Sequence, residues 1–482
     1  MGTTLDDIIE KIRAFIASEA RVPEGDDAFT SDVHLFDAGY LDSLRLVTLL
    51  AFIEATFQVE LGEGALFSEQ FTTIRGIAKL VHAARLEVAP RKPERPQRHP
   101  CIRPFVAADL PAVTRLYEFV ERSGTRNPAR GLEAYFRRIL LDQPHGDSDL
   151  PSHVYEEDGS IEGFIGTHVR RLLFRGRLVR VACAGQIVVE PRSRHKAVGL
   201  HLLKEFLSGP QDLAMTDGAT LDVLHMWEQF GGRPRAVGNV RWTRLFRPWR
   251  FAVDLLTRRN GTAGRLLKPL GLLGAPLLDS LTRPVAGMRL RGPASPPLRA
   301  EELTPEAMVE GLHVLSSVSL LPAYDRDYLR WLFFELGKVR SRGQLRRVLL
   351  REPSGSVAGW YLYYLARDGV CQVLQVAAPR SHAKAVLAHM FHDADRAGAA
   401  VLQGRVEPDL LAPLSQMGVS LQHTWSYAMA YTRDPELAAA VHGGDALLTR
   451  LDGEWWCGFQ HEPLDEPRPL PSERVKAAGV AA

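Results

Sequence analysis

The chain has 482 residues, of which 45% are hydrophobic and 24% are charged, and this composition is typical of a soluble globular protein of two to four domains. Its four cysteines lie far apart without a CxxC pair, so we expect no zinc site, no disulfide framework and a reducing compartment. The N-terminal stretch is acidic and amphipathic rather than a signal peptide, and no run of 18 apolar residues occurs. A cytoplasmic protein is expected.

The formal net charge of +2 conceals an uneven distribution. Residues 1–86 carry 14 acidic and 7 basic residues, whereas the rest of the chain carries 43 acidic and 52 basic residues. An acidic module tethered to a basic body favours electrostatic docking within one chain. A basic excess scattered over solvated faces is the alternative.

The first 85 residues have the pattern of a small helical bundle. Apolar residues at helical spacing predict helices over 5–19 and 71–84, and a further helix beginning beside Ser43. A segment rich in proline and charge, residues 86–100, predicts a semi-rigid linker.

The residues Gly39-Tyr40-Leu41-Asp42-Ser43-Leu44 resemble the signature of acyl carrier proteins, and the resemblance covers residues 1–85. It implies that Ser43 carries 4′-phosphopantetheine, and that a phosphopantetheinyl transferase and an acyl-loading enzyme are partners. A serine at a helix N-terminus suits a phosphodiester, because the free N–H groups and the helix dipole favour negative charge. The alternative is that Asp42 and Ser43 only cap the helix.

Residues 101–250 alternate between strand and helix patterns, which predicts an α+β domain. Within it, the segment 184–207 resembles the pyrophosphate-binding region of GCN5-related N-acyltransferases: Val189-Glu190-Pro191 is followed by a loop and a helix. Arg194, Ala197 and Gly199 occupy the loop positions of the family motif. The resemblance implies a cofactor site, with charge from arginine and lysine side chains and an oxyanion held by strand N–H groups. The predicted cofactor-binding residues are Ser43, Ile187, Val189, Arg192, Arg194, Lys196, Ala197, Val198 and Gly199.

Ala197 stands where the family has glycine. A carrier-bound donor presents one phosphate and needs less of the cradle, so the arm on Ser43 is the favoured donor and acyl-coenzyme A is the alternative. Residues 227–234 resemble the motif that closes the same fold, with Trp227 in place of the family's proton-donating tyrosine. Because indole cannot replace that tyrosine as a proton donor, His225 is the predicted general acid. Asp217, at the end of a predicted strand, is the predicted general base. A turn residue and a surface histidine are the alternatives for these two positions.

Residues 251–297 are basic and rich in leucine, which is typical of helices between domains, and contact with a membrane or an acyl chain is the alternative. The strand and helix pattern then repeats over 298–435, where both loop glycine positions are lost to Ala385 and Leu387. The fold prediction is a multidomain protein with an all-α carrier bundle, two α+β domains similar to the N-acyltransferases, the second degenerate, and a tail over 436–482.

The predicted function is transfer of an acyl group from phosphopantetheine on Ser43 to a small-molecule amine. The arrangement also resembles, more loosely, the carrier-dependent N-acyl amino acid synthases. The alternatives are a non-catalytic carrier protein within a biosynthetic assembly and an acyltransferase that uses coenzyme A. Nucleic acid is not an expected partner, because the arginines lie beside an acyltransferase motif.

Overall fold

The computed structural model describes residues 4–86, 101–252 and 298–458, apart from interior gaps at 21, 24, 42–44, 46–47, 50–51, 54–55, 58, 60–68, 236, 316–317, 367–369 and 425. The predicted linker, the leucine-rich segment over 253–297 and Ser43 itself therefore lie outside the described residues. So do the side chains of Arg194 and Lys196, although their backbone is described.

The N-terminal region is the predicted helical carrier bundle. It contains α1 (Leu5–Ala20), η1 (Glu69–Thr72) and α4 (Ile74–Leu86). The isoleucines of α1, at positions 8, 9, 12 and 16, are buried against Ile74, Ile77 and Val81 of α4. The period of these apolar positions matches the helix, which explains why both helices were predictable from sequence.

Two mixed sheets form the rest of the described chain. The first, of eight strands among the described residues, has the order β1-β2-β3-β4-β5-β15-β6, with β9 paired to β3. Its strands are β1 (Cys101–Pro104), β2 (His153–Glu157), β3 (Ser160–Phe174), β4 (Arg177–Val189), β5 (Leu213–Ala219), β6 (Arg233–Pro234), β9 (Leu320–Pro322) and β15 (Tyr427–Tyr431).

The second sheet has seven strands in the described part of the chain, in the order β14-β7-β13-β12-β11-β10-β8. They are β7 (Val240–Leu245), β8 (Arg299–Glu302), β10 (Gln344–Arg351), β11 (Val357–Leu365), β12 (Val370–Ala377), β13 (Val401–Arg405) and β14 (Ser420–His423). The predicted carrier bundle followed by an α+β region is thereby confirmed.

The two sheets exchange strands. Strand β7, which comes early in the chain, pairs with β13 and β14 of the second sheet, whereas β15, near the end, pairs with β5 and β6 of the first. The two sheets are therefore interlocked: each contains a strand from the part of the chain that forms most of the other sheet. Sequence patterning identifies both strands but cannot assign their partners.

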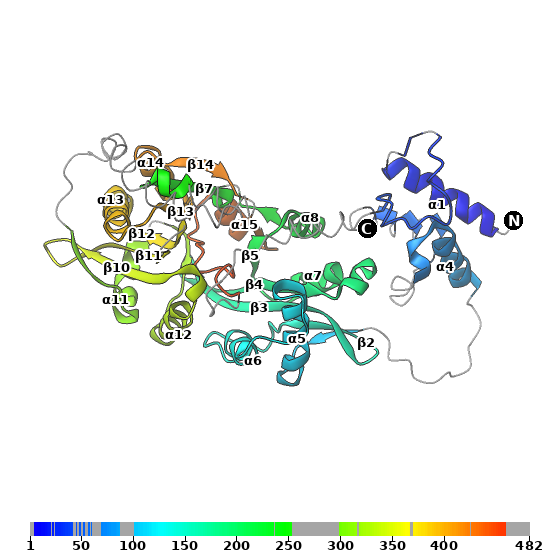
Figure 1. The fold of residues 1–482 in the computed structure, drawn as a ribbon, viewed down its shortest axis with the longest axis horizontal. Helices are drawn as coiled ribbons and strands as arrows, with labels where there is room; N and C mark the ends of the chain where they lie inside the picture. Colours follow the sequence, from blue (N-terminus) through cyan, green and yellow to red (C-terminus); the bar gives the residue numbers. More distant parts are fainter. Residues whose placement is uncertain are drawn as a thin grey trace.

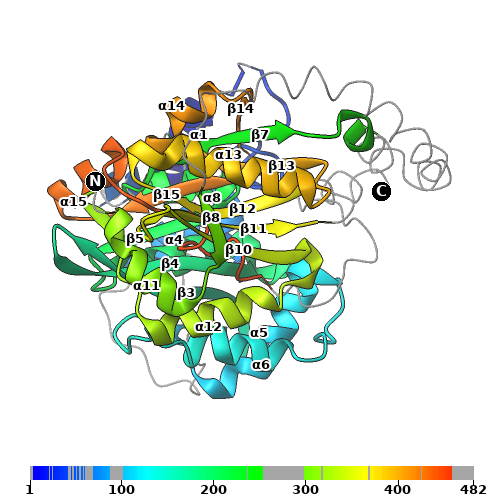
Figure 2. The same ribbon diagram turned by 90° about the vertical axis from the view of Figure 1, so that its left-hand side faces the viewer.

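Helices cover the outer faces of the sheets. Figure 2 shows α5 (Leu110–Tyr117), α6 (Leu132–Phe136) and α12 (Arg326–Gly337) together on one side, where their apolar residues join one core with both sheets. The remaining helices are α7 (Val198–Ser208), α8 (Leu221–Gln229), α11 (Pro305–Glu310), α13 (Arg380–Arg396), α14 (Pro408–Ser415) and α15 (Pro435–Gly443). None of the helices in the described ranges is long and apolar enough to cross a membrane.

The segment after α15 runs into the interior. The Leu451 N–H donates to the carbonyl of Leu374 on β12, while Glu454 accepts hydrogen bonds from β5, so residues 446–457 contact both sheets. Leu451, Trp456 and Cys457 are fully buried. This part of the predicted tail is therefore a core element.

Candidate active site

Strands β4 and β5 separate beyond a short paired stretch. They pair in parallel only from Val181–Cys183 to Leu213–Met215 and then diverge. Gln186 lies in the left-handed region with φ +47°, and the register between β3 and β4 shifts beside it. This irregularity turns the end of β4 away from β5, and it opens the sheet next to Ile187 and Val189.

The loop after β4 has the predicted form. A short 3₁₀ helix over Pro191–Lys196 leads to Ala197, which begins α7 in the left-handed conformation with φ +53° and ψ +26°. Left-handed backbone costs alanine about 1–2 kcal/mol, and glycine avoids that cost. Gly199 has no such need, because a Cβ there would make only ordinary contacts at 3.5 and 3.6 Å. Ala197 is thus the strained residue of the motif.

The N-terminus of α7 follows this loop, and its free N–H groups form the element that suits a phosphate. Arg192 donates to Glu162 at 2.8 Å, and Ser193 also donates to Glu162, so these residues fasten the loop to β3. Ile187 and Val189 border an apolar cluster that includes the fully buried Trp227 of α8. Ile187 and Val189 thus form a partly buried apolar wall beside the loop.

Ala197 also contacts the carrier bundle. Its side chain packs against the apolar core formed by α1, α4 and their neighbours. Figure 1 shows the carrier region beside the end of the α+β region that holds α7 and α8. The carrier therefore lies against the loop predicted to bind the phosphate of its arm.

The two predicted catalytic residues lie in different surroundings. His225 is exposed on α8, whereas Asp217 of β5 is buried, at 2% exposure. Asp217 Oδ1 accepts hydrogen bonds from the N–H groups of Glu454 and Trp455 at 2.9 and 2.8 Å. Its Oδ2 has no hydrogen-bond partner among the described residues and lies 4.0 Å from Nη1 of Arg405.

Glu454 is a site residue that the sequence analysis missed. Its carboxyl accepts from the N–H of Asp217 at 2.8 Å, the N–H of Gly218 at 2.8 Å, the hydroxyl of Thr216 and the thiol of Cys183 at 3.0 Å. Burial raises the pKa of Glu454, and the neighbouring Asp217 carboxylate raises it further. The carboxyl groups of Glu454 and Asp217 therefore share one buried space at the end of β5, which favours the protonated form of Glu454.

A histidine of β3 and a glutamine of β4 form a hydrogen-bonded pair at the irregularity of β4. His168 Nε2 lies 2.7 Å from Oε1 of Gln186, and Gln186 Nε2 donates to the carbonyl of Cys457 at 3.0 Å. Because the amide nitrogen is committed to Cys457, its oxygen accepts, and His168 carries its proton on Nε2. Burial lowers the pKa of His168 to about 3, so the ring is neutral at pH 7.

Arg170 holds the 452–457 turn. Its guanidinium donates to the carbonyls of Asp452 at 3.1 Å and Gly453 at 3.4 Å, and it lies near the rings of Tyr328 and Trp456. The signal for this turn was the sequence DGEWWCG, in which two acidic residues precede two adjacent tryptophans. Sequence alone does not show which cleft such a segment enters.

The corresponding loop of the second copy lacks the phosphate-binding features. Helix α13 begins at Arg380 directly after Pro379, which has ordinary extended backbone, and no left-handed residue opens it. Gln375 lies on β12, where it accepts a hydrogen bond from Trp360 and donates to Tyr324 and Thr449. These contacts make Gln375 a packing residue of the core.

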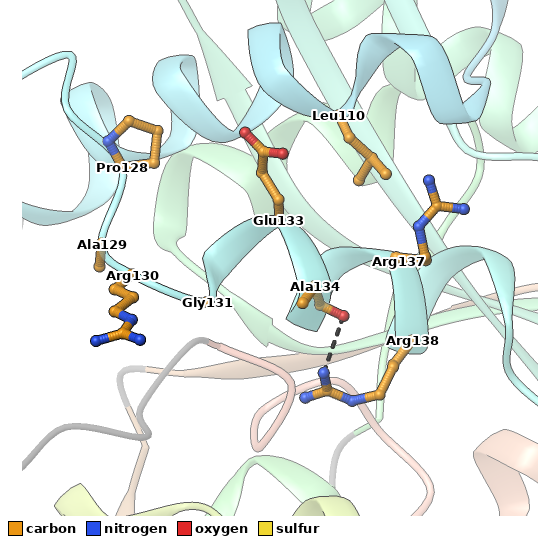
Figure 3. A pocket seen from close by; sticks show the side chains of 9 residues that line it. All are labelled: Leu110, Pro128, Ala129, Arg130, Gly131, Glu133, Ala134, Arg137 and Arg138. Atoms are coloured by element: carbon orange, nitrogen blue, oxygen red, sulfur yellow. Dashed lines mark hydrogen bonds between the residues drawn. The ribbon is translucent and has the colours of Figure 1, made fainter.

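An open groove of about 700 Å³ lies on the outer face beside α6. Figure 3 shows Arg137 and Arg138 on consecutive positions there, and Arg138 donates to the carbonyl of Ala134. Arg138 also pairs with the buried Glu335 at 2.6 Å, whereas Arg130 and Arg137 are exposed. Among the described residues, no group of three or more His, Cys, Asp or Glu side chains is placed to hold a metal.

Comparison with known proteins agrees with a carrier domain. Residues 10–81 match the family model "Phosphopantetheine attachment site", so this part of the chain is a phosphopantetheine carrier domain. Ser43 falls within the matched residues, and a serine of such a domain carries the arm. A phosphopantetheinyl transferase is therefore a partner of this protein.

The α+β region is similar to solved acyltransferase structures at low identity. A probable N-acyltransferase from Enterococcus faecalis is 11% identical with a TM-score of 0.45, covering 69% of this chain and 72% of that one. A GCN5-related N-acetyltransferase from Kribbella flavida is 16% identical with a TM-score of 0.44, covering 71% and 73%. The N-myristoyltransferase of Saccharomyces cerevisiae is 12% identical with a TM-score of 0.41, covering 74% and 89%. No curated protein matches the chain in a sequence search.

Proposed function

We propose that this protein transfers an acyl group from phosphopantetheine on its own carrier domain to a small-molecule amine. The observation that carries the proposal is the contact between Ala197 and the carrier core, because it sets the carrier against the loop at the N-terminus of α7. A tethered donor also has an effective concentration of roughly millimolar. Delivery within one chain therefore needs no free acyl-coenzyme A.

The residues at the site fit such an arm. The α7 N-terminus and the 191–199 loop bind its phosphate, and Arg192 of that loop adds positive charge. Ile187 and Val189 supply an apolar wall, and N–H groups at the end of β4 face the thioester oxygen. The arm, when loaded, supplies an activated thioester carbonyl.

The transfer forms a C–N bond and breaks the C–S bond. The attacking amine must lose a proton, and Asp217 Oδ2 is the acceptor that we assign, because it has no hydrogen-bond partner within the described chain. Glu454 and Arg405 position Asp217 from either side. The thiolate leaves unaided or takes a proton from His225, the exposed acid on α8.

The test is a single-turnover assay on the full chain loaded with an acyl-phosphopantetheine. Amine addition should give an amide and a free thiol at a first-order rate that does not depend on protein concentration. Ser43→Ala should abolish loading, and Asp217→Asn should load normally but transfer about 10²–10⁴ times more slowly. Undiminished transfer by Asp217→Asn would remove Asp217 from the mechanism.

The two alternatives give different results in the same assay. A coenzyme A-dependent enzyme would form amide from free acyl-coenzyme A with the Ser43→Ala variant. A non-catalytic carrier protein would accept the acyl group and pass it only to a separate enzyme.

A further inference from the structure

A small cavity lies in the second sheet, where β12 and β13 diverge. The two strands pair only from Val370–Gln372 to Val401–Gln403, as β4 and β5 do in the first sheet. The cavity beyond this point has a volume of about 10 Å³, which leaves room for one small species and none for a larger ligand. Three of its lining residues are charged: Arg405, Glu407 and Arg450.

Each of these charged residues has a buried polar atom without a hydrogen-bond partner in the described chain. The atoms are Nε and Nη1 of Arg450, Nε of Arg405 and Oε2 of Glu407. Arg405, Glu407 and Arg450 are each at most 7% exposed. Buried polar groups in folded proteins are nearly always paired, so several orphan donors around one void indicate a missing partner.

The charge around the cavity is positive. Arg450 is subject to repulsion from Arg405, Arg342 and Arg241 and to attraction from Asp217, and together with burial this lowers its pKa well below the usual value. Burial raises the pKa of Glu407 to about 8, so this carboxyl keeps its proton at neutral pH. Asp217 lies 4.0 Å from Arg405, whereas Arg450 has no carboxylate within 4.0 Å in the described chain, so an anion in the cavity would offset the charge of Arg450.

We propose that this cavity binds one small monovalent anion of the size of chloride, to which Arg450, Arg405 and the Glu407 hydroxyl donate. The size of the void excludes acetate and larger carboxylates in this conformation. Arg405 also donates to the carbonyl of Asp217 and to that of Ser426, at 2.8 Å for the latter, so the anion fixes a side chain that reaches from the second sheet to the first. This site is separate from the loop proposed to bind the arm, but it shares Arg405 with the surroundings of Asp217.

The first test is thermal unfolding of the full chain, followed by tryptophan fluorescence, in chloride and in gluconate at equal ionic strength. Once the site is saturated, the unfolding midpoint should rise by roughly 2 °C for each tenfold increase in chloride. Gluconate and acetate should give no such rise. Arg450→Gln should abolish the chloride dependence, and Arg130→Gln, at an exposed arginine of the outer groove, should keep it.

The second test does not depend on a folded variant. Crystals of the wild-type protein grown in bromide should show an anomalous peak within hydrogen-bonding distance of Arg450 Nη1. A water molecule in the cavity without anomalous signal, or equal unfolding midpoints in chloride and gluconate, would overturn the proposal.

Discussion

Removing the Glu454 side chain tests the buried carboxyl site most simply. Glu454→Ala leaves the N–H groups of Asp217 and Gly218 and the Thr216 hydroxyl without their acceptor in a fully buried space. Each such donor costs about 1–3 kcal/mol, so the variant should lose about 3–9 kcal/mol of unfolding free energy. Glu454→Gln keeps the Oε1 acceptor but points an amide at the Asp217 N–H and the Cys183 thiol, and it should lose about 1–2 kcal/mol.

Urea unfolding followed by tryptophan fluorescence measures this loss in the α+β region alone, because all eight tryptophans lie beyond residue 86. Glu133→Ala is the matched control, since Glu133 is exposed in the outer groove and its removal should change stability by less than about 0.5 kcal/mol. A loss below about 1 kcal/mol in Glu454→Ala would refute the assignment of Glu454 as the buried acceptor of these donors.

Three further predictions concern the same region. Burial lowers the pKa of His168 to about 3, so its ring stays neutral in the folded protein, whereas in the unfolded chain it gains a proton below about pH 6.5. The free energy of unfolding should therefore fall by about 2 kcal/mol from pH 6.5 to pH 5. His168→Gln should remove this pH dependence in urea titrations. Ala197→Gly should relieve left-handed strain and raise the unfolding midpoint in urea, whereas a lowered midpoint would contradict the assigned backbone. Gly453→Ala should destabilise by about 1–3 kcal/mol, measured by urea unfolding, because the new Cβ would overlap the Asp217 carboxylate, and an unchanged midpoint would contradict that packing.

Much of the candidate site between β4 and β5 was predictable, because the sequence patterns that indicate it are local. The apolar periods of α1 and α4 gave the carrier helices, and the Pro191 and Gly199 spacing located the loop and α7. Asp217 was predicted at the end of β5 and is found there, although its role as base stays a prediction. Local patterns of this kind depend only on neighbours in the chain.

The strand exchange and the buried turn were not predictable, for a physical reason. Which sheet β7 or β15 joins depends on pairings across more than 150 residues, and β-strand patterns do not specify a partner. Glu454 likewise looks like a polar tail residue until Thr216, Cys183 and two backbone N–H groups are seen around it. Its place as a buried hydrogen-bond acceptor follows from tertiary contacts that no local motif encodes.

The most direct test of the central claim is intact-mass analysis of the full chain after loading with an acyl-phosphopantetheine and addition of an amine. The account predicts that the acyl mass leaves the wild-type protein, that an equal amount of amide appears at a concentration-independent rate, and that Ser43→Ala never gains the arm. An acylated protein that keeps its acyl group with every amine tested, or amide formation that requires free acyl-coenzyme A, would contradict it.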